Sequence, residues 1–230
     1  MAIKISGSTI IDDGRSLVNV GVSTISGDLH VGTGVTVFST TGIVSATAYH
    51  HSDGTFIGFR QDVQENLYAG TSAGAASDSD TSFNIAFGCN AGTALNAGDK
   101  NILMGCQAGK SLTSGSRNII FGVNGACANL SIHSDNVFIG SYTGLYQASS
   151  HNVAIGNNAA IKCFTGGSNV AIGRMAGCGG SGGALTATSN VFLGKYAGRN
   201  ITDGDQNIFL GTYAGGGQDL TGDNLSLIHI

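Results

Sequence analysis

Acidic residues could supply hydrolytic chemistry, because enzymes that cleave glycosidic bonds use two carboxyl groups facing each other across the sugar. Glu65 is the single glutamate of this 230-residue chain, and most aspartates stand beside Gly or Ser, as in Asp203-Gly204. An aspartate in such a position accepts hydrogen bonds from the turn backbone, which explains it without catalysis. The sequence therefore predicts no catalytic residue and no enzymatic activity.

The five cysteines offer a second chemistry, nucleophilic attack or disulfide formation. Cys89 and Cys106 hold equivalent positions in successive copies of a repeated phrase, so we expect them beside each other and not beside a histidine. Two parallel side chains in register seldom have disulfide geometry. Cys127, Cys163 and Cys178 fall outside that column. An odd count without a secretory signal favours reduced, structural thiols.

Metal and phosphate binding would each need one particular segment. His50-His51-Ser52-Asp53 has metal-ligand residue types, and three copies in a trimer could converge on an axial ion. Adjacent histidines point to opposite sides of a strand, however, and a solvated turn explains them equally well. The glycine-rich run Gly177 to Gly183 lacks the Lys-Ser/Thr and the helix of a phosphate loop. We predict no metal and no cofactor, and the sequence leaves open whether His50 and His51 bind an ion.

A short repeated phrase must position all these residues. It consists of an Asn, three mostly apolar residues, a Gly, and a few small residues that usually close on Ala-Gly. Its nine copies begin at Asn66, Asn84, Asn101, Asn118, Asn136, Asn152, Asn169, Asn190 and Asn207. Spacings of 16 to 21 residues predict an all-β fold, a parallel β-solenoid or β-roll of about 17 residues per coil.

The three apolar residues of a phrase alternate between the two faces of a strand. The middle ones are Tyr68, Ala86, Leu103, Ile120, Phe138, Ala154, Ala171, Phe192 and Phe209. None is charged, so we expect both strand faces to be buried. The outer pair would fill the coil, and sister chains would cover the middle column in a homo-oligomer, expected to be a trimer. The alternative is that the middle column packs inside its own coil.

Two columns mark the corners of the coil. The fifth position is Gly in every copy, from Gly70 to Gly211, which suits a positive φ or a close approach of neighbouring backbones. Stacked Asn amides, about 4.8 Å apart, would form a hydrogen-bonded ladder. The longer interval from Asn169 to Asn190 predicts a loop that bulges from the stack.

The repeats also divide the chain. Residues 1–65 contain short β-branched runs between turns and predict a slender, strand-rich stalk or attachment segment. Residues 66–224 form the predicted solenoid, with a tenth copy beginning at Asn224. Residues 225–230 resemble the translation of an adapter used in sequencing libraries, which predicts that the natural protein continues past Asn224.

Composition and charge exclude several classes of protein. The chain has 38 Gly but no Pro and no Gly-X-Y period, which excludes collagen. A net charge of −4 without a basic stripe predicts no nucleic acid partner. No window approaches the about 18 apolar residues of a membrane span, which predicts no membrane insertion. The first residues contain no long apolar run, so we expect no secretory signal.

The phrases Asn152-Val153-Ala154-Ile155-Gly156 and Asn169-Val170-Ala171-Ile172-Gly173 resemble the repeats of two families. One is the β-roll head of trimeric autotransporter adhesins. The other is the repeat region of bacteriophage tail fibres, where Asn-x-x-Ile-Gly-x-x-Ala-Gly repeats of this length occur. The opening segments 19–24 and 42–47 look like fibre segments from phages of marine cyanobacteria.

The tail-fibre resemblance implies a rigid homotrimeric rod in the virion tail, assembled in the host cytoplasm and extracellular when mature. It further implies two kinds of partner, other virion tail proteins and a host cell-surface receptor, which we expect to be a glycan. The adhesin repeat is usually shorter, and an adhesin needs an export signal. The alternative functions are a bacterial surface adhesin head and a polysaccharide-binding or depolymerising solenoid spike.

Overall fold

The computed structural model describes residues 3–5, 8–11, 60–126, 128, 132–146, 148–161, 165–179, 186–216 and 222–229. The chain divides into two units, Met1–Ala46 and Thr47–Ile230. In the first unit, β1 (Ile3–Ile5) pairs antiparallel with β2 (Ser8–Ile11). Most of the expected stalk lies outside the described residues, and so does the His50 to Asp53 cluster.

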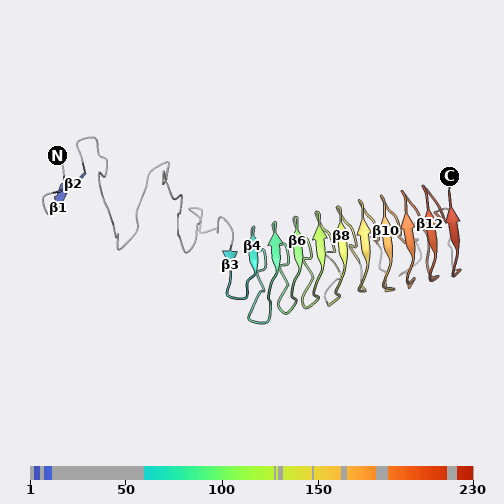
Figure 1. Ribbon diagram of the computed structural model, residues 1–230, viewed down its shortest axis with the longest axis horizontal. Helices are drawn as coiled ribbons and strands as arrows, with labels where there is room; N and C mark the ends of the chain where they lie inside the picture. The colour runs from blue at the N-terminus through green and yellow to red at the C-terminus, as the bar shows by residue number, and fades with distance from the viewer. Residues whose placement is uncertain are drawn as a thin grey trace. The chain divides into compact units, whose positions relative to one another are not determined.

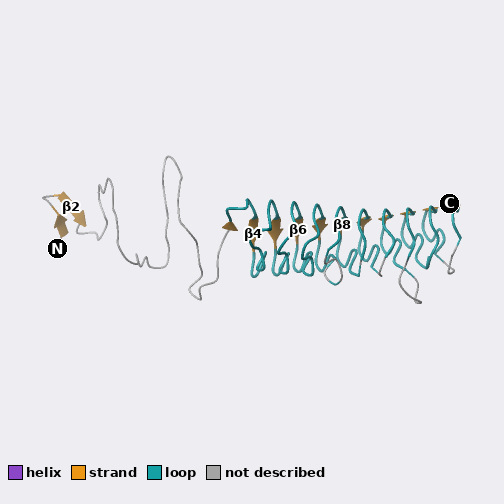
Figure 2. Ribbon diagram, turned by 90° about the horizontal axis from the view of Figure 1, so that it is seen from below, coloured by secondary structure: helices purple, strands orange, loops and turns teal. Residues whose placement is uncertain are grey.

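The second unit contains a parallel β-solenoid, as the repeat predicts. Its sheet opens with β3 (Arg60–Gln61), which pairs antiparallel with the first of ten parallel strands. These are β4 (Leu67–Ala69), β5 (Ile85–Phe87), β6 (Ile102–Met104), β7 (Ile119–Phe121), β8 (Val137–Ile139), β9 (Val153–Ile155), β10 (Val170–Ile172), β11 (Val191–Leu193), β12 (Ile208–Leu210) and β13 (Ser226–Ile228). The strands lie side by side in chain order in Figure 1. Turns connect them, and the described residues include no helix (Figure 2).

Neighbouring phrases pair in one register throughout. Val153 lies opposite Val170, and Val170 lies opposite Val191 even though four more residues separate the second pair. The extra residues are therefore accommodated between strands without shifting the ladder, as expected for an inserted loop. Residues 180–185 of that interval are outside the described part of the chain.

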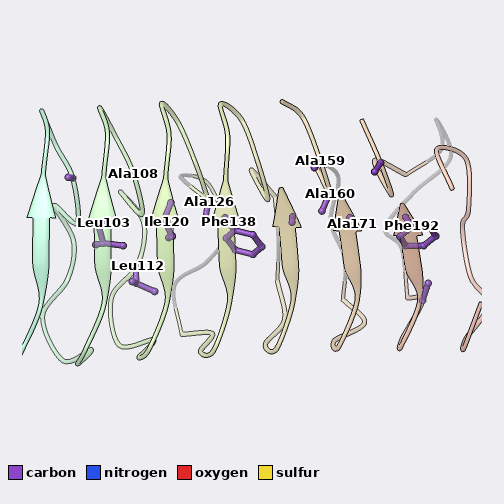
Figure 3. Close-up of a cluster of buried hydrophobic side chains, with 14 of the residues drawn as sticks. Leu103, Ala108, Leu112, Ile120, Ala126, Phe138, Ala159, Ala160, Ala171 and Phe192 are labelled. Atoms are coloured by element: carbon purple, nitrogen blue, oxygen red, sulfur yellow. The ribbon is translucent and has the colours of Figure 1, made fainter. Parts of the chain in front are cut away.

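The middle residue of each strand from β4 to β12 points into its own coil. These residues are at most 2% exposed, whereas the outer residues are half-buried or exposed. In Figure 3, Leu103, Phe138 and Phe192 lie within the coils, together with Ala108 and Leu112 from the connecting turns. The rings of Phe192 and Phe209 stack with centroids 5.5 Å apart. A single chain thus builds one continuous, narrow core.

This orientation is the reverse of the expected one, so the prediction that sister chains cover the middle column is wrong. The alternative, packing within the same coil, is what the structure has. The reason is the asparagine two positions before each middle residue. Side chains two apart on a strand share a face, and the Asn amide must point inward to reach the carbonyls of the turn. The middle residue follows it inward, and the outer pair faces out.

The asparagine column forms the expected ladder. The Asn84 backbone N–H and side-chain amide donate to Asn66 Oδ1 at 2.8 and 3.0 Å, and its Nδ2 also donates to the Gly98 carbonyl at 2.8 Å. The backbone bond to the preceding asparagine recurs at every step through Asn207. All nine asparagines are at most 3% exposed. Because these side chains point inward, the hydrogen bonds of the ladder are shielded from water.

The glycine corner has both features expected of it. Gly156 has φ +135°, in the region that disfavours side chains, and a Cβ added there would lie 2.6 Å from the Gly173 carbonyl oxygen on the next coil. Real contacts of this kind are not that short, so a side chain would push neighbouring coils apart. The corner requires glycine on both counts.

The last coil begins one residue later than the spacing suggests. The Leu225 amide, not that of Asn224, donates to Asn207 Oδ1 at 2.7 Å, so Leu225 stands in the asparagine column. β13 still pairs in parallel with β12, with Leu227 opposite Phe209. Leu227 is 37% exposed, unlike the other middle residues.

Candidate functional site

The outer side chains of the strands form a continuous apolar surface, which we call the strand face. On β5 to β12 it consists of Ile85, Phe87, Ile102, Met104, Ile119, Phe121, Val137, Ile139, Val153, Ile155, Val170, Ile172, Val191, Leu193, Ile208 and Leu210. None of these is charged or polar. In-register pairing aligns them in two columns along the stack.

The strand face is not covered within the chain. Ile208 is 47% exposed, Leu193 43%, Leu210 39% and Ile139 37%. A sheet with one face in water ordinarily carries polar residues on that face. A contiguous exposed apolar surface of several hundred Å² is typical of an interaction site.

A second surface lies at the corner that follows the strand, near the C-terminal end of the stack. Arg174, Lys195, Tyr196, Arg199 and Tyr213 gather there, and we call them the Tyr196 cluster. The rings of Tyr196 and Tyr213 stack with centroids 4.7 Å apart and an interplanar angle of 25°. The Lys195 ammonium lies 5.2 Å from the Tyr196 ring centroid, and the guanidinium carbons of Arg199 and Arg174 lie at 5.1 and 5.7 Å.

The coil itself holds this cluster in place. Tyr196 and Tyr213 occupy the same position of successive phrases, and both have φ of 61°. The Tyr196 amide donates to the Arg174 carbonyl at 3.0 Å, and the Tyr213 amide donates to the Lys195 carbonyl at 2.9 Å. The backbone ladder therefore fixes the spacing of the rings and the cations along the stack.

A third group is self-contained. Arg117 Nε and Nη2 donate to the two Asp135 carboxylate oxygens at 2.6 and 2.8 Å, and His151 Nε2 lies 3.7 Å from Asp135 Oδ2. The hydrogen bonds from Arg117 lower the pKa of the Asp135 carboxyl below its usual value, and Asp135 in turn raises the pKa of Arg117. Each of these three residues precedes the asparagine of one of three successive coils. Their side chains therefore pair with one another along the stack.

The residues that the sequence singles out for chemistry lie apart. Glu65 is exposed at the turn before Asn66. Aspartates in the turns accept hydrogen bonds from backbone amides. Asp99 accepts from Ser82 at 2.8 Å, and Asp205 accepts from Thr188 at 2.7 Å. Both bonds join neighbouring coils, whereas the predicted local capping is seen at Asp62 and Asp78, which accept from the amides of Gln64 and Asp80 at 3.2 and 3.0 Å.

No disulfide joins the cysteines within the described residues. Cys89 and Cys106 are exposed on neighbouring coils, and Cys178 is buried. The state of Cys89 and Cys106 agrees with the geometry predicted for that pair. Cys127 and Cys163 lie outside the described part, as do residues 180–183 of the glycine-rich run.

Sequence reasoning missed the Tyr196 cluster. Its five residues span positions 174 to 213, and the longer interval before Asn190 separates Arg174 from Lys195 by 21 residues. Aligning the phrases on their asparagines would place Arg174 above Lys195 and Tyr196 above Tyr213. A search of the two columns that follow the corner glycine could thus have found every member of the cluster except Arg199.

No protein-family model, curated protein or solved structure matches the chain. The described residues contain no helix long and apolar enough to cross a membrane. They also contain no cluster of three or more His, Cys, Asp or Glu side chains suited to holding a metal ion. The β-solenoid and its surfaces are therefore the basis for a functional assignment.

Proposed function

We propose that this protein is a structural fibre protein of a bacteriophage tail, in which three chains associate through their strand faces into a rigid rod that contributes to host-surface recognition. The uncovered apolar strand face carries this proposal. The resemblance of the repeats to tail-fibre repeats supplies the biological setting and the copy number.

The size of the strand face supports self-association. The eight strands β5 to β12, spaced about 4.8 Å apart and about 10 Å long, present a surface of about 380 Å². That is about half of the roughly 800 Å² that each partner buries in a stable interface, so the flanking turns must supply the rest. A second and a third copy are the simplest cover, because the same kind of apolar side chain recurs on every strand from β5 to β12.

The rod-like character follows from the stack. Each coil contacts only its neighbours, and backbone hydrogen bonds and the asparagine ladder tie every coil to the next. Such a segment would hold a terminal binding element at a fixed distance from a particle. The mechanism that we propose is therefore mechanical and not catalytic.

Light scattering of the purified full-length chain tests the proposal. A mass of three times 23.1 kDa is the expected result. A folded, soluble monomer at micromolar concentration would contradict it, because the strand face would then not drive association. Virion structural genes beside the gene would support the tail fibre, whereas a β-barrel anchor downstream in the same reading frame would favour the adhesin.

A further inference from the structure

The Tyr196 cluster has a composition unlike its surroundings. The chain carries a net charge of −4 and has only ten Lys and Arg residues, yet three of them surround one tyrosine ring. Attraction between each cation and the ring face offsets part of the repulsion among them. The arrangement still concentrates positive charge on one exposed corner of an acidic protein.

These cations are not neutralised by carboxylates of the described residues. Among the described residues, the ion pairs are those of Arg117 and His151 with Asp135. Neither pair includes a member of the Tyr196 cluster. Asp205, on a neighbouring coil, is engaged with the Thr188 amide in the turn before the strand. The outward N–H donors of Arg174, Lys195 and Arg199 are therefore available to an external anion.

The aromatic part of the cluster adds a flat apolar surface. Tyr213 is 50% exposed, and it stacks on Tyr196 in a row that runs along the stack. Exposed tyrosine rings of this kind present both a face for packing against C–H groups and a hydroxyl for hydrogen bonding. Guanidinium groups beside the rings can bind a carboxylate or phosphate through paired N–H donors.

We infer that the Tyr196 cluster is a lateral binding site for an acidic glycan, with a sugar ring against Tyr213 and its anionic substituent against Arg174, Lys195 and Arg199. The inference deepens the proposed function and rests on it for its biological meaning, since it names the chemistry of the host surface that the side of the rod would contact. A glycan is favoured over nucleic acid because the cationic region spans only a few coils. A long polyanion would extend over the rest of an acidic chain.

Repetition in a trimer would strengthen the site. Three copies around one rod could engage one polysaccharide chain or several on the same cell surface, and avidity would multiply a weak single-site affinity. The position on the shaft distinguishes this site from a binding element at the end of a fibre.

Binding of the full-length chain to polygalacturonate, dextran sulfate and neutral dextran, measured by biolayer interferometry, tests the inference. We expect binding to one or both acidic polymers and none to dextran. The two acidic polymers separate recognition of carboxylate from recognition of sulfate. The triple variant Arg174→Gln, Lys195→Gln, Arg199→Gln should weaken binding by about tenfold or more, and Tyr213→Ala should weaken it by about threefold to tenfold.

Two matched variants serve as controls. Arg117→Gln removes a cation that is already paired with Asp135, and Tyr142→Ala removes a tyrosine at the same phrase position on a coil outside the cluster. Both should bind within about twofold of the wild-type chain. Circular dichroism of all variants identifies any that fail to fold.

Three results would overturn the inference. The first is that the wild-type chain binds neither acidic polymer, and the second is that the triple variant binds as tightly as the wild type. The third is that oligodeoxythymidylate, a nucleic acid measured in the same assay, binds more tightly than either acidic glycan. The mass of the chain is measured separately by light scattering, so the two proposals can fail independently. A monomer that binds acidic glycan would therefore refute the trimeric rod alone, and a trimer that does not bind would refute the glycan site alone.

Discussion

At the residue scale, the eighth residue after each asparagine of the phrase shows how the backbone conformation and the core side chain are matched. This residue has a positive φ in every coil from the phrase at Asn66 to the phrase at Asn207, with values between 45° and 61°. It is Gly where the middle residue is aromatic, as at Gly144 opposite Phe138 and Gly198 opposite Phe192. It is Ala only where the middle residue is Ile120 or Ala154, at Ala126 and Ala160. An added Cβ at Gly74, Gly144 or Gly198 would come within 3.0 Å of the ring of Tyr68, Phe138 or Phe192, so these rings leave no room for one.

Substitution of Gly198 by Ala tests this match. A Cβ there would overlap the Phe192 ring, whereas at Gly92 it would meet the end of the Leu103 side chain, 2.7 Å away, which can move. Gly198→Ala and Gly92→Ala both place an alanine in the left-handed backbone region, which costs about 1–2 kcal/mol. Gly198→Ala should lose about 1–3 kcal/mol more from overpacking, in urea denaturation. Equal losses in the two variants would show that the ring does not decide the residue.

The Arg117–Asp135 pair predicts a pH dependence. The pKa of Asp135 is lowered in the folded chain, so its ionised form stabilises the fold above the pKa of the unfolded state. That contribution should be lost as the pH falls from about 5 through the lower folded value. The difference in denaturation midpoint between wild type and Asp135→Asn should be small, because the pair is exposed, and should vanish in acid. A difference that grows on acidification would contradict the assignment.

At the element scale, three-residue strands are too short to be stable alone. Each is secured by hydrogen bonds to both neighbours and by the asparagine that precedes it. Stability in such a stack is a sum of coil and interface contributions, so a defect should act locally. The asparagine ladder is the interface contribution that recurs without variation from Asn66 to Asn207.

Replacement of Asn118 by Ala should break the ladder at one step. Its Oδ1 accepts both the backbone N–H and the side-chain amide of Asn136 at 3.1 Å, and both donors are buried. Leaving them without a partner should cost about 2–4 kcal/mol in denaturation. Hydrogen exchange should accelerate most at the Asn136 amide. The control Asn157→Ala removes an exposed amide and should change stability by about 0.5 kcal/mol or less.

At the scale of the whole molecule, the core and the exposed apolar surface lie on opposite sides of the same strands. The core is satisfied within one chain, so a single copy can hold its coils together. The strand face is not covered within the chain, so the outer columns are the surface that sister chains would cover in the proposed trimer. Self-association is therefore proposed from Ile139, Ile155 and their neighbours, and not from the buried phenylalanines.

Ile155→Lys should dissociate the proposed trimer. A lysine in the middle of the strand face would lose hydration on assembly without a partner of opposite charge. Light scattering should then give the mass of one chain, while circular dichroism remains that of the wild type because the side chain points away from the core. Asn157→Lys, at the exposed corner of the same coil, should leave the mass unchanged. Retention of the trimer mass by both variants would exclude the strand face as the interface.

The regular part of the fold could be predicted from the sequence because each coil repeats its own local constraints. The phrase spacing determined the parallel stack, Gly156 and its equivalents determined the corners, and the asparagines determined the ladder. The Asn169 to Asn190 interval could be recognised as an insertion because the phrases on either side of it are intact. These features depend on neighbours in the chain or in the next coil, which a periodic sequence displays directly.

The tertiary structure decided which strand face is inside. Alternation shows that Phe138 and Ile139 point in opposite directions, but it does not say which direction is inward. The asparagine amides decide it, because they need the carbonyls that only the closed coil brings within reach. The structure also brought the Arg174 guanidinium to the Tyr196 ring, because the parallel register continues across the inserted loop that separates them in the chain.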